Sequence, residues 1–512
     1  MQPSASVRMI VAGLLTGLLA ACGTSSGADH RAEPGPGTDL AAAEGVRWKT
    51  CAPQVPGQPS ADALTWQCGV LRVPLDHTEP DGTQIGLAMI RTRATDSGHR
   101  LGSLLFNFGG PGGSGVDTLP SAAHLFETLR TRYDLVSFDP RGVGASEGVH
   151  CLNDRRLDAW FAADNTPDTP AEEKAYLGGV KDFNAACEKN SGPVLPYVGT
   201  RDAARDMDLM RAALGDERLH YFGISYGTEL GGVYAHLFPK KVGRAVLDSA
   251  VDPTLDATHR SLAQAEGFQL ALENYAKDCA ARGEACPLGE DPDEAVKKVA
   301  ALVERLDQHP LPGIGKRRLT QALATSGIAQ ALYSQDFWPI LSEALEEANT
   351  DDGRTLMALG DALNGRDPDG TYSTLQASFT AIGCADSSER PTAADVREVL
   401  PKFRKASPAF GEFMAWSLVS CTDWPVRGES RTADVSAKGA DPILVVGTTN
   451  DPATPFEGTE RMVAELGEDV GHQLTNEGEG HGAYTGGSSC VREVVDAYLF
   501  EGTTPPKGKT CR

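Results

Sequence analysis

Two patterns alternate along the chain from about residue 69 onward. Short apolar runs bounded by glycine or proline are typical of strands buried on both faces, and segments with helical apolar spacing lie between them. The predicted strands are 69–75, 85–92, 103–108, 135–138, 219–224, 245–248, 443–447 and 473–476, with helices at 203–214 and 229–237 among the segments between. This alternation predicts an α/β fold with a mostly parallel central sheet covered by helices.

The middle of the chain has a different pattern. Strand-like runs are scarce between residues 254 and 420, and amphipathic helices dominate, as where Val296, Val299 and Val303 fall on one helical face. The strand pattern resumes at Pro442. We therefore expect a sheet domain built from residues 46–253 and 421–512, with 254–420 inserted as a helical cap before the strand that leads to the catalytic acid.

The N-terminal segment has the features of a bacterial export signal. Arg8 precedes an apolar run, Met9–Ala21, that is too short to span a bilayer. The run ends in L-A-A-C, which resembles a lipobox and implies lipidation of Cys22. We predict a signal peptide at 1–21, a flexible Gly/Ser/Pro-rich tether at 22–45, and an extracytoplasmic lipoprotein anchored in the membrane, with release to the medium as a second location. Ordinary secretion is the alternative.

Charge and cysteines narrow the class of protein. The net charge of −23 argues against nucleic-acid binding, which needs a basic surface. Cys22 aside, the 11 cysteines leave an even number, so disulfides are expected outside the cytoplasm. Sequence leaves their connectivity open; nearest-neighbour pairing would give 51–68, 151–187, 279–286, 384–421 and 490–511. No metal-ligand spacing occurs, and neither a metal nor a cofactor is expected.

The pattern G-x-S-x-G occurs twice and is weak on its own. At 223–227 it lies between a predicted strand and a predicted helix, which is the context of a nucleophile elbow. At 144–148 that context is missing. We therefore predict that Ser225 is the nucleophile and that Ser146 is not.

A serine nucleophile needs a base and an acid, which follow it in the order acid, then histidine on this fold. His481 lies in a glycine-rich loop just after the strand 473–476 and is the predicted base. The histidines that compete with it are His259, His309 and His472. Asp451 follows the strand 443–447 and is the predicted acid, with Asp248 as its competitor.

Acyl transfer also needs hydrogen-bond donors for the developing oxyanion. The strand 103–108 leads into G-G-P-G-G-S-G at 109–115, where glycines permit close backbone approach. We expect the backbone N–H groups of Tyr226 and Gly110 to form the oxyanion hole, with Gly109 as the alternative to Gly110.

These motifs together carry a family resemblance. N-F-G-G-P-G resembles the H-G-G-P-G signature of proline iminopeptidases, with Asn107 in place of the histidine, and D-P-R-G-V-G-A-S at 139–146 resembles a turn of the same group. With G-I-S-Y-G, D-P-A-T-P, C-T-D-W-P at 421–425, the lipobox and the even cysteines, the chain resembles secreted tripeptidyl aminopeptidases of actinobacteria over residues 45–512.

The resemblance implies a serine exopeptidase that releases short peptides, tripeptides in the family, from free N-termini. It implies the triad Ser225, Asp451 and His481, and peptide substrates as partners. For the substrate amine we single out Asp252, and we expect a monomer. Two alternatives stay open: an esterase or lipase with the same triad, and a peptide-binding lipoprotein with an inactive site.

Overall fold

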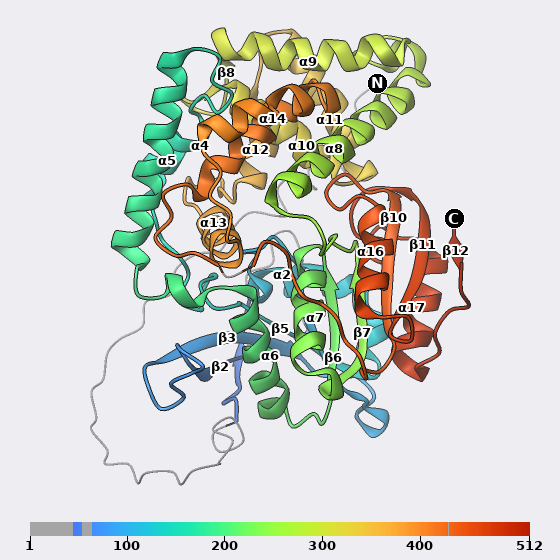
Figure 1. Ribbon diagram of the computed structural model, residues 1–512. Coiled ribbons are helices and arrows are strands. Elements are labelled where there is room, and N and C mark those ends of the chain that lie inside the picture. The colour runs from blue at the N-terminus through green and yellow to red at the C-terminus, as the bar shows by residue number, and fades with distance from the viewer. Residues whose placement is uncertain (1–44, 54–63, 429) are drawn as a thin grey trace.

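The computed structural model describes residues 45–53, 64–428 and 430–512 (Figure 1). A large sheet with helices on both faces forms the lower part in this view, and a helical region lies above it. The signal peptide predicted at 1–21, Cys22 and nearly all of the tether predicted at 22–45 lie outside the described residues. None of the described helices is long and apolar enough to cross a membrane.

The sheet has ten strands, and most of its neighbours are parallel. In spatial order the strands are β1 (Lys49–Cys51), β2 (Trp66–Pro74), β3 (Gln84–Thr92), β5 (Tyr133–Phe138), β4 (Gly102–Asn107), β6 (Leu219–Ile224), β7 (Val242–Asp248), β10 (Ile443–Asn450), β11 (Gly471–Glu479) and β12 (Thr510–Cys511). Pairing is antiparallel from β1 to β5 and parallel from β5 to β12. Every predicted strand is confirmed; β1 and β12 are too short to give a pattern.

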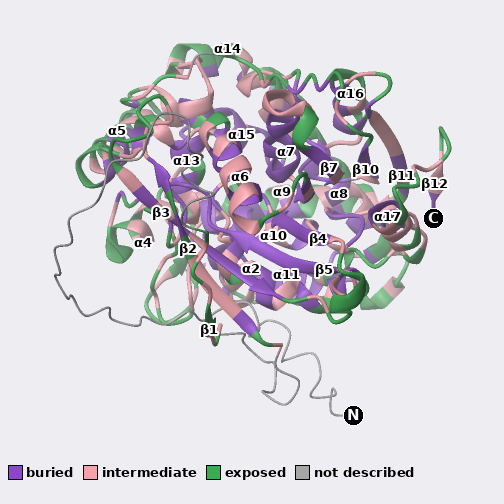
Figure 2. Cartoon of the chain, turned by 90° about the horizontal axis from the view of Figure 1, so that it is seen from below, coloured by how far each residue is buried: buried purple, intermediate pink, exposed green. Residues whose placement is uncertain are grey.

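Helices cover both faces of this sheet. On one face α2 (Gly115–Ala122) and α17 (Ser489–Glu501) bury apolar side chains, and on the other α6 (Thr200–Leu214), α7 (Tyr226–Leu237) and α16 (Glu457–Leu466) do so. The central strands β4 and β5 are buried at every position (Figure 2). Since parallel strands end at one edge, the loops after β4, β6, β7, β10 and β11 gather there, where α/β folds place their sites.

Most regular elements described between β7 and β10 are helices, beside the two-residue strands β8 (Leu311–Pro312) and β9 (Arg318–Leu319). Seven of the longer helices share a hydrophobic core separate from the two that flank the sheet. They are α8 (Ala257–Ala280), α9 (Pro292–Gln308), α10 (Gln321–Leu332), α11 (Trp338–Asn349), α12 (Arg354–Leu363), α14 (Ala393–Ala406) and α15 (Gly411–Ser417). The remaining helix, α13 (Leu375–Asp386), instead buries apolar side chains in one of the cores that flank the sheet. We call the region between β7 and β10 the cap.

The division at residue 254 stays a prediction, and the first part of the chain also contributes contacts to the cap. α4 (Asp154–Phe161) and α5 (Pro170–Ser191) lie in the stretch assigned to the sheet domain. In α5, Phe183 and Cys187 belong to a core that flanks the sheet, whereas Val180 belongs to the cap core. The helical pattern of α5 could not reveal this double contact, because it arises only from tertiary packing.

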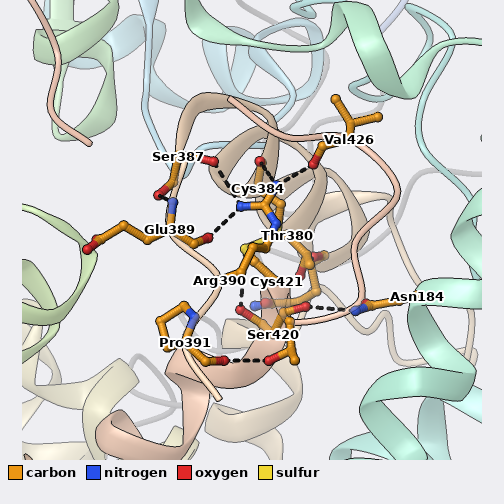
Figure 3. Close-up of a disulfide and its surroundings, with 12 residues drawn as sticks. Asn184, Thr380, Cys384, Ser387, Glu389, Arg390, Pro391, Ser420, Cys421 and Val426 are labelled. Atoms are coloured by element: carbon orange, nitrogen blue, oxygen red, sulfur yellow. Dashed lines mark hydrogen bonds between the residues drawn. A yellow bond between two sulfur atoms is a disulfide. The ribbon is translucent and has the colours of Figure 1, made fainter. Parts of the chain in front are cut away.

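Five disulfides join nearest neighbours in sequence: Cys51–Cys68, Cys151–Cys187, Cys279–Cys286, Cys384–Cys421 and Cys490–Cys511. Figure 3 shows Cys384–Cys421, which ties α13 to the segment that returns to the sheet. Beside it the Arg390 guanidinium donates to the carbonyl oxygens of Cys384 and Ser387. This disulfide therefore fixes one end of α13, whose other end contacts the glycine-rich loop after β4.

Candidate active site

Ser225 lies at a sharp turn between β6 and α7. Its backbone has φ 59° and ψ −127°, a conformation that non-glycine residues rarely adopt and that is found at functional sites. A Cβ on Gly223 would lie 2.4 Å from the Gly227 carbonyl oxygen, and one on Gly227 would lie 2.5 Å from the Asn107 carbonyl oxygen. Both glycines of G-I-S-Y-G are thus required by close backbone approach, which makes 223–227 a nucleophile elbow.

Ser146 has a structural position instead. Its side chain is fully buried, and its hydroxyl accepts a hydrogen bond of 2.8 Å from the Ala88 backbone N–H. In the same turn, buried Arg141 forms a paired contact with Asp206, with both N–O distances 2.7 Å. The D-P-R-G-V-G-A-S segment therefore links β2, β3 and α6, and Ser146 is not available to a substrate.

His481 and Asp451 form a buried pair. The ring Nδ1 lies 2.8 and 2.9 Å from the two carboxylate oxygens of Asp451, whose side chain has no exposed surface. Burial lowers the pKa of His481, but the charge and hydrogen bond of Asp451 and the charge of Asp248 outweigh it and raise that pKa above the ordinary 6.5. Because Nδ1 faces the acid, Nε2 is the nitrogen left for proton transfer.

Thr454 completes this pair and was missed in the sequence. Its hydroxyl donates to Asp451 at 3.0 Å and lies 3.3 Å from Nδ1 of His481. The backbone N–H groups of Ala453 and Thr454 also donate to Asp451, both at 2.9 Å. The spacing D-x-x-T is the signal that could have found it, because a short polar side chain at this offset closes a turn.

The glycine-rich loop after β4, residues 109–115, covers the elbow; we call it the oxyanion loop after its predicted role. A Cβ on Gly109 would lie 2.8 Å from Cβ of Ser225 and 3.3 Å from the Tyr226 nitrogen. The Gly109 N–H is already bound to Asn107 Oδ1 at 3.0 Å. The Gly110 N–H has no partner among the described residues, and Tyr226, as the first residue of α7, has no intrahelical acceptor for its own. This geometry favours Gly110 over Gly109 beside Tyr226, and the oxyanion role stays a prediction.

Asp248 is close to the triad, but it is not in contact with the imidazole. Its carboxylate accepts the N–H groups of Ala483 and Tyr484 at 3.0 and 2.9 Å, and its carbonyl accepts the Ser225 N–H at 3.0 Å. Burial raises the pKa of Asp248 to about 6 against the opposing effect of those two N–H groups. The geometry therefore favours Asp451 over Asp248 as the predicted acid, and Asp248 links Ser225 to the loop of His481.

The Ser225 hydroxyl makes no hydrogen bond to the imidazole within the described part of the chain, and such bonds often form only with substrate. Asp252 bonds Thr254 in a local turn through its Oδ1, so its assignment to the substrate amine stays a prediction. In the same part of the chain, no group of three or more His, Cys, Asp or Glu side chains is arranged to hold a metal ion.

The region between β7 and β10 contacts three loops of the site: the acid loop after β10, the histidine loop after β11 and the oxyanion loop after β4. On α8, Gly267 approaches the acid loop so closely that a Cβ would lie 2.5 Å from the Pro452 carbonyl oxygen. After α10, the Tyr333 carbonyl accepts the His481 N–H at 2.8 Å. On α13, the Leu375 carbonyl oxygen lies 2.6 Å from the position of a Cβ on Gly112.

A nucleophile elbow, an acid–histidine pair in the order required by this fold, and a parallel sheet with a cap define an α/β-fold serine hydrolase. Serine protease Hip1 of Mycobacterium tuberculosis is 40% identical over 91% of this chain and 91% of that protein. Carboxylesterase B of the same species is 37% identical over 100% and 98%, and tripeptidyl aminopeptidase of Streptomyces coelicolor is 31% identical over 92% and 86%.

The family model described as TAP-like protein matches residues 407–511. The chain therefore belongs to the TAP-like family of α/β hydrolases. Among solved structures, a proline iminopeptidase of Mycobacterium smegmatis is 16% identical, with a TM-score of 0.33, over 84% of this chain and 97% of that one. The fold assignment does not rest on this distant likeness but on the sheet topology and the elbow.

Proposed function

We propose that this protein is a serine exopeptidase that releases short peptides, tripeptides above all, from free N-termini. The observation that carries the proposal is the convergence of Ser225, the Asp451–His481 pair and the Gly110 N–H on loops at one sheet edge. This N–H has no hydrogen-bond partner among the described residues. Two relatives, named serine protease Hip1 and tripeptidyl aminopeptidase, support peptide as the substrate class.

The proposed mechanism is acyl transfer in two steps. Ser225 Oγ attacks the scissile carbonyl carbon while His481 Nε2 takes its proton, and the Gly110 and Tyr226 N–H groups bind the oxyanion. The C–N bond then breaks as His481 gives that proton to the leaving amine. Water, deprotonated by His481, next attacks the acyl-enzyme, and the serine recovers its proton. Asp451 fixes the ring and stabilises the imidazolium throughout.

A carboxylesterase with the same triad is the second candidate. The relative named carboxylesterase B, which is 37% identical, favours it, and the chemistry at Ser225 would be the same. The two candidates differ in the bond that is cleaved and in whether the substrate needs a free amine.

The cellular setting is also part of the proposal. The apolar run Met9–Ala21 and the L-A-A-C sequence support export and lipidation at Cys22. The five disulfides fit an oxidising compartment outside the cytoplasm. We expect the protein to act as a monomer on peptides, tethered to the membrane through residues 22–45. Mass spectrometry of membrane-extracted protein tests this: a Cys22→Ala variant should lose the lipid mass and move to the soluble fraction.

Substrate class is tested with three matched compounds: a tripeptide anilide with a free amine, the same anilide with a blocked amine, and a short-chain ester. The exopeptidase proposal expects the free-amine anilide to have the highest kcat/KM, and mass spectrometry of a digested peptide pool should show products shortened from the N-terminus. Ser225→Ala is the control for contaminating activity. Preference for the blocked anilide or the ester would overturn the exopeptidase in favour of the second candidate.

A further inference from the structure

The loop that carries His481 has no regular secondary structure, yet every backbone N–H from Gly480 to Tyr484 is bound. Gly480 donates to the Asn450 carbonyl at 3.4 Å, and His481 donates to the Tyr333 carbonyl at 2.8 Å. The next three N–H groups donate to the side chains of Asp248, the last residue of β7, and Ser249, the residue after it. Gly482 donates to Ser249 Oγ at 2.7 Å, and Ala483 and Tyr484 donate to the two oxygens of Asp248.

The same two residues reach the other parts of the triad through their backbone. The Asp248 carbonyl accepts the Ser225 N–H at 3.0 Å, and the Ser249 N–H donates to Val446 of β10 at 2.9 Å. Ser249 has φ 57°, so it joins Ser225 among the four described non-glycine residues in the left-handed region. Backbone strain of this kind persists only where the surroundings determine the conformation, and it clusters at functional sites.

We propose that Asp248 and Ser249 are positioning residues that set the place of His481 relative to Ser225, by holding three successive N–H groups of the loop that follows the histidine. The proposal rests on the catalytic role proposed above for His481. Within the described part of the chain, neither side chain forms a hydrogen bond with Ser225 Oγ or with the His481 ring. The backbone of these two residues binds the nucleophile elbow and β10, and their side chains bind the histidine loop.

Asp248 also adds a negative charge near the imidazole. The charged groups facing it are Asp451 from the loop after β10 and His481 itself, and beyond Tyr484 on α17 lie Arg492 and Asp496. Its carboxylate is fully buried, so its charge is poorly screened by water. An imidazolium formed during the reaction is therefore stabilised by Asp248 as well as by Asp451.

The two side chains differ in charge, and this difference makes the test specific. In Asp248→Asn one acceptor becomes an NH2 group facing a backbone N–H, and the charge is lost. We expect kcat to fall by roughly 10- to 100-fold, KM to stay within about twofold, and the acidic limb of the kcat/KM profile to move to lower pH. In Ser249→Ala the charge remains, so we expect kcat to fall by roughly tenfold with the acidic limb unmoved.

The matched control is Asp216→Asn. Asp216 is a half-buried carboxylate that accepts the Ser103 N–H at 3.1 Å, where β4 begins, at the opposite edge of the sheet from the site. We expect kcat and the acidic limb to be unchanged there. Thermal unfolding measured on all variants shows which are folded, and Ser249→Ala keeps the proposal testable if Asp248→Asn does not fold.

Rates are measured on whichever substrate the wild-type protein turns over, beside the rate of labelling by a fluorophosphonate probe. A wild-type protein that is not labelled contradicts the proposed function itself. Suppose instead that the wild-type protein is labelled, that Asp248→Asn and Ser249→Ala are labelled at the same rate, and that the acidic limb does not move. This result overturns only the positioning role of Asp248 and Ser249. A drop in Tm without a change in kcat would likewise reduce the two residues to a structural role.

Discussion

The sheet domain and the cap contribute to the site in different ways. The sheet domain supplies every group proposed to react, each from a loop that follows a strand: Ser225 after β6, Asp451 after β10 and His481 after β11. The cap supplies one contact to each of three loops, through Gly267, Tyr333 and Leu375. The chemistry is therefore local to the sheet edge, whereas the placement of the loops is shared with the cap.

This difference has a consequence for how the two regions tolerate change. A change in the sheet domain removes one reacting group and leaves the others in place. A change in the cap core acts on the acid loop and the histidine loop together, because α8 packs in that core and Tyr333 packs against it. The oxyanion loop is contacted separately by α13, which packs in a core that flanks the sheet. We therefore expect large, specific losses from the sheet domain and smaller, distributed losses from the cap.

The largest effect is expected from Ser225→Ala. Removal of the nucleophile should lower kcat by about 10⁴- to 10⁶-fold, since the oxyanion hole and substrate binding alone still accelerate hydrolysis. Stopped assays with purified protein and loss of fluorophosphonate labelling measure it. Ser146→Ala is the matched control within the second G-x-S-x-G pattern. If its labelling were lost while that of Ser225→Ala survived, the assignment of the elbow would be wrong.

Asp451→Asn should come next. The amide keeps the shape of the acid but cannot hold the ring as a carboxylate does, so kcat should fall by about 10⁴-fold with KM little changed. Thr454→Ala removes only one hydrogen bond to the same acid, and a loss of about tenfold is expected, close to 1.4 kcal/mol in the barrier. Steady-state kinetics of both variants rank them, and equal losses would contradict the division of roles between the two residues.

Sequence predicted those parts of the site that are local or fixed by chain order. The elbow around Ser225 is encoded within five residues, and Asp451 and His481 follow from their places after strands. The contact of Tyr333 with His481 could not be predicted, because it joins residues 148 positions apart by tertiary packing. The contact of α5 with the cap core could not be predicted for the same reason. The turn that contains Thr454 could be predicted from the D-x-x-T spacing, but the contact of its hydroxyl with the His481 ring could not.

Gly267→Ala tests the cap contact to the acid loop. The added methyl would lie 2.5 Å from the Pro452 carbonyl oxygen, so α8 or the loop must shift. We expect kcat/KM to fall by roughly 10- to 100-fold and the free energy of unfolding to fall by about 1–3 kcal/mol.

The control for this variant is Gly383→Ala in cap helix α13, where no atom lies within 4 Å of the added Cβ. Alanine should stabilise that helix by about 0.5–1 kcal/mol and leave activity unchanged. If Gly267→Ala were as active as Gly383→Ala, the cap would not share in placing the acid loop.

The pH dependence follows from the raised pKa of His481. The base must be neutral, so activity should fall about tenfold per pH unit below that pKa, starting above the ordinary 6.5. The free energy of unfolding should show the opposite trend. The protonated His481–Asp451 pair stabilises the fold fully below about pH 6.5, and this stabilisation is lost as the pH rises through the pKa of His481 in the folded protein. Kinetic profiles and thermal melts on one sample compare the two, and an acidic limb below pH 6.5 would contradict the shift.

The smallest effect on activity is expected from the disulfide between Cys384 and Cys421, which closes a separation of 37 residues. Replacing both cysteines by alanine should lower the free energy of unfolding by about 2–4 kcal/mol. The matched pair Cys279–Cys286 closes only 7 residues within the cap, so its loss should cost roughly 1–2 kcal/mol less in the loop-entropy account. Neither change touches a reacting group, and kcat of the folded variants should stay within about twofold at 25 °C. A large kcat loss in the Cys384–Cys421 variant alone would show that anchoring α13 at Cys384 helps to place the oxyanion loop, which contacts the helix at Leu375.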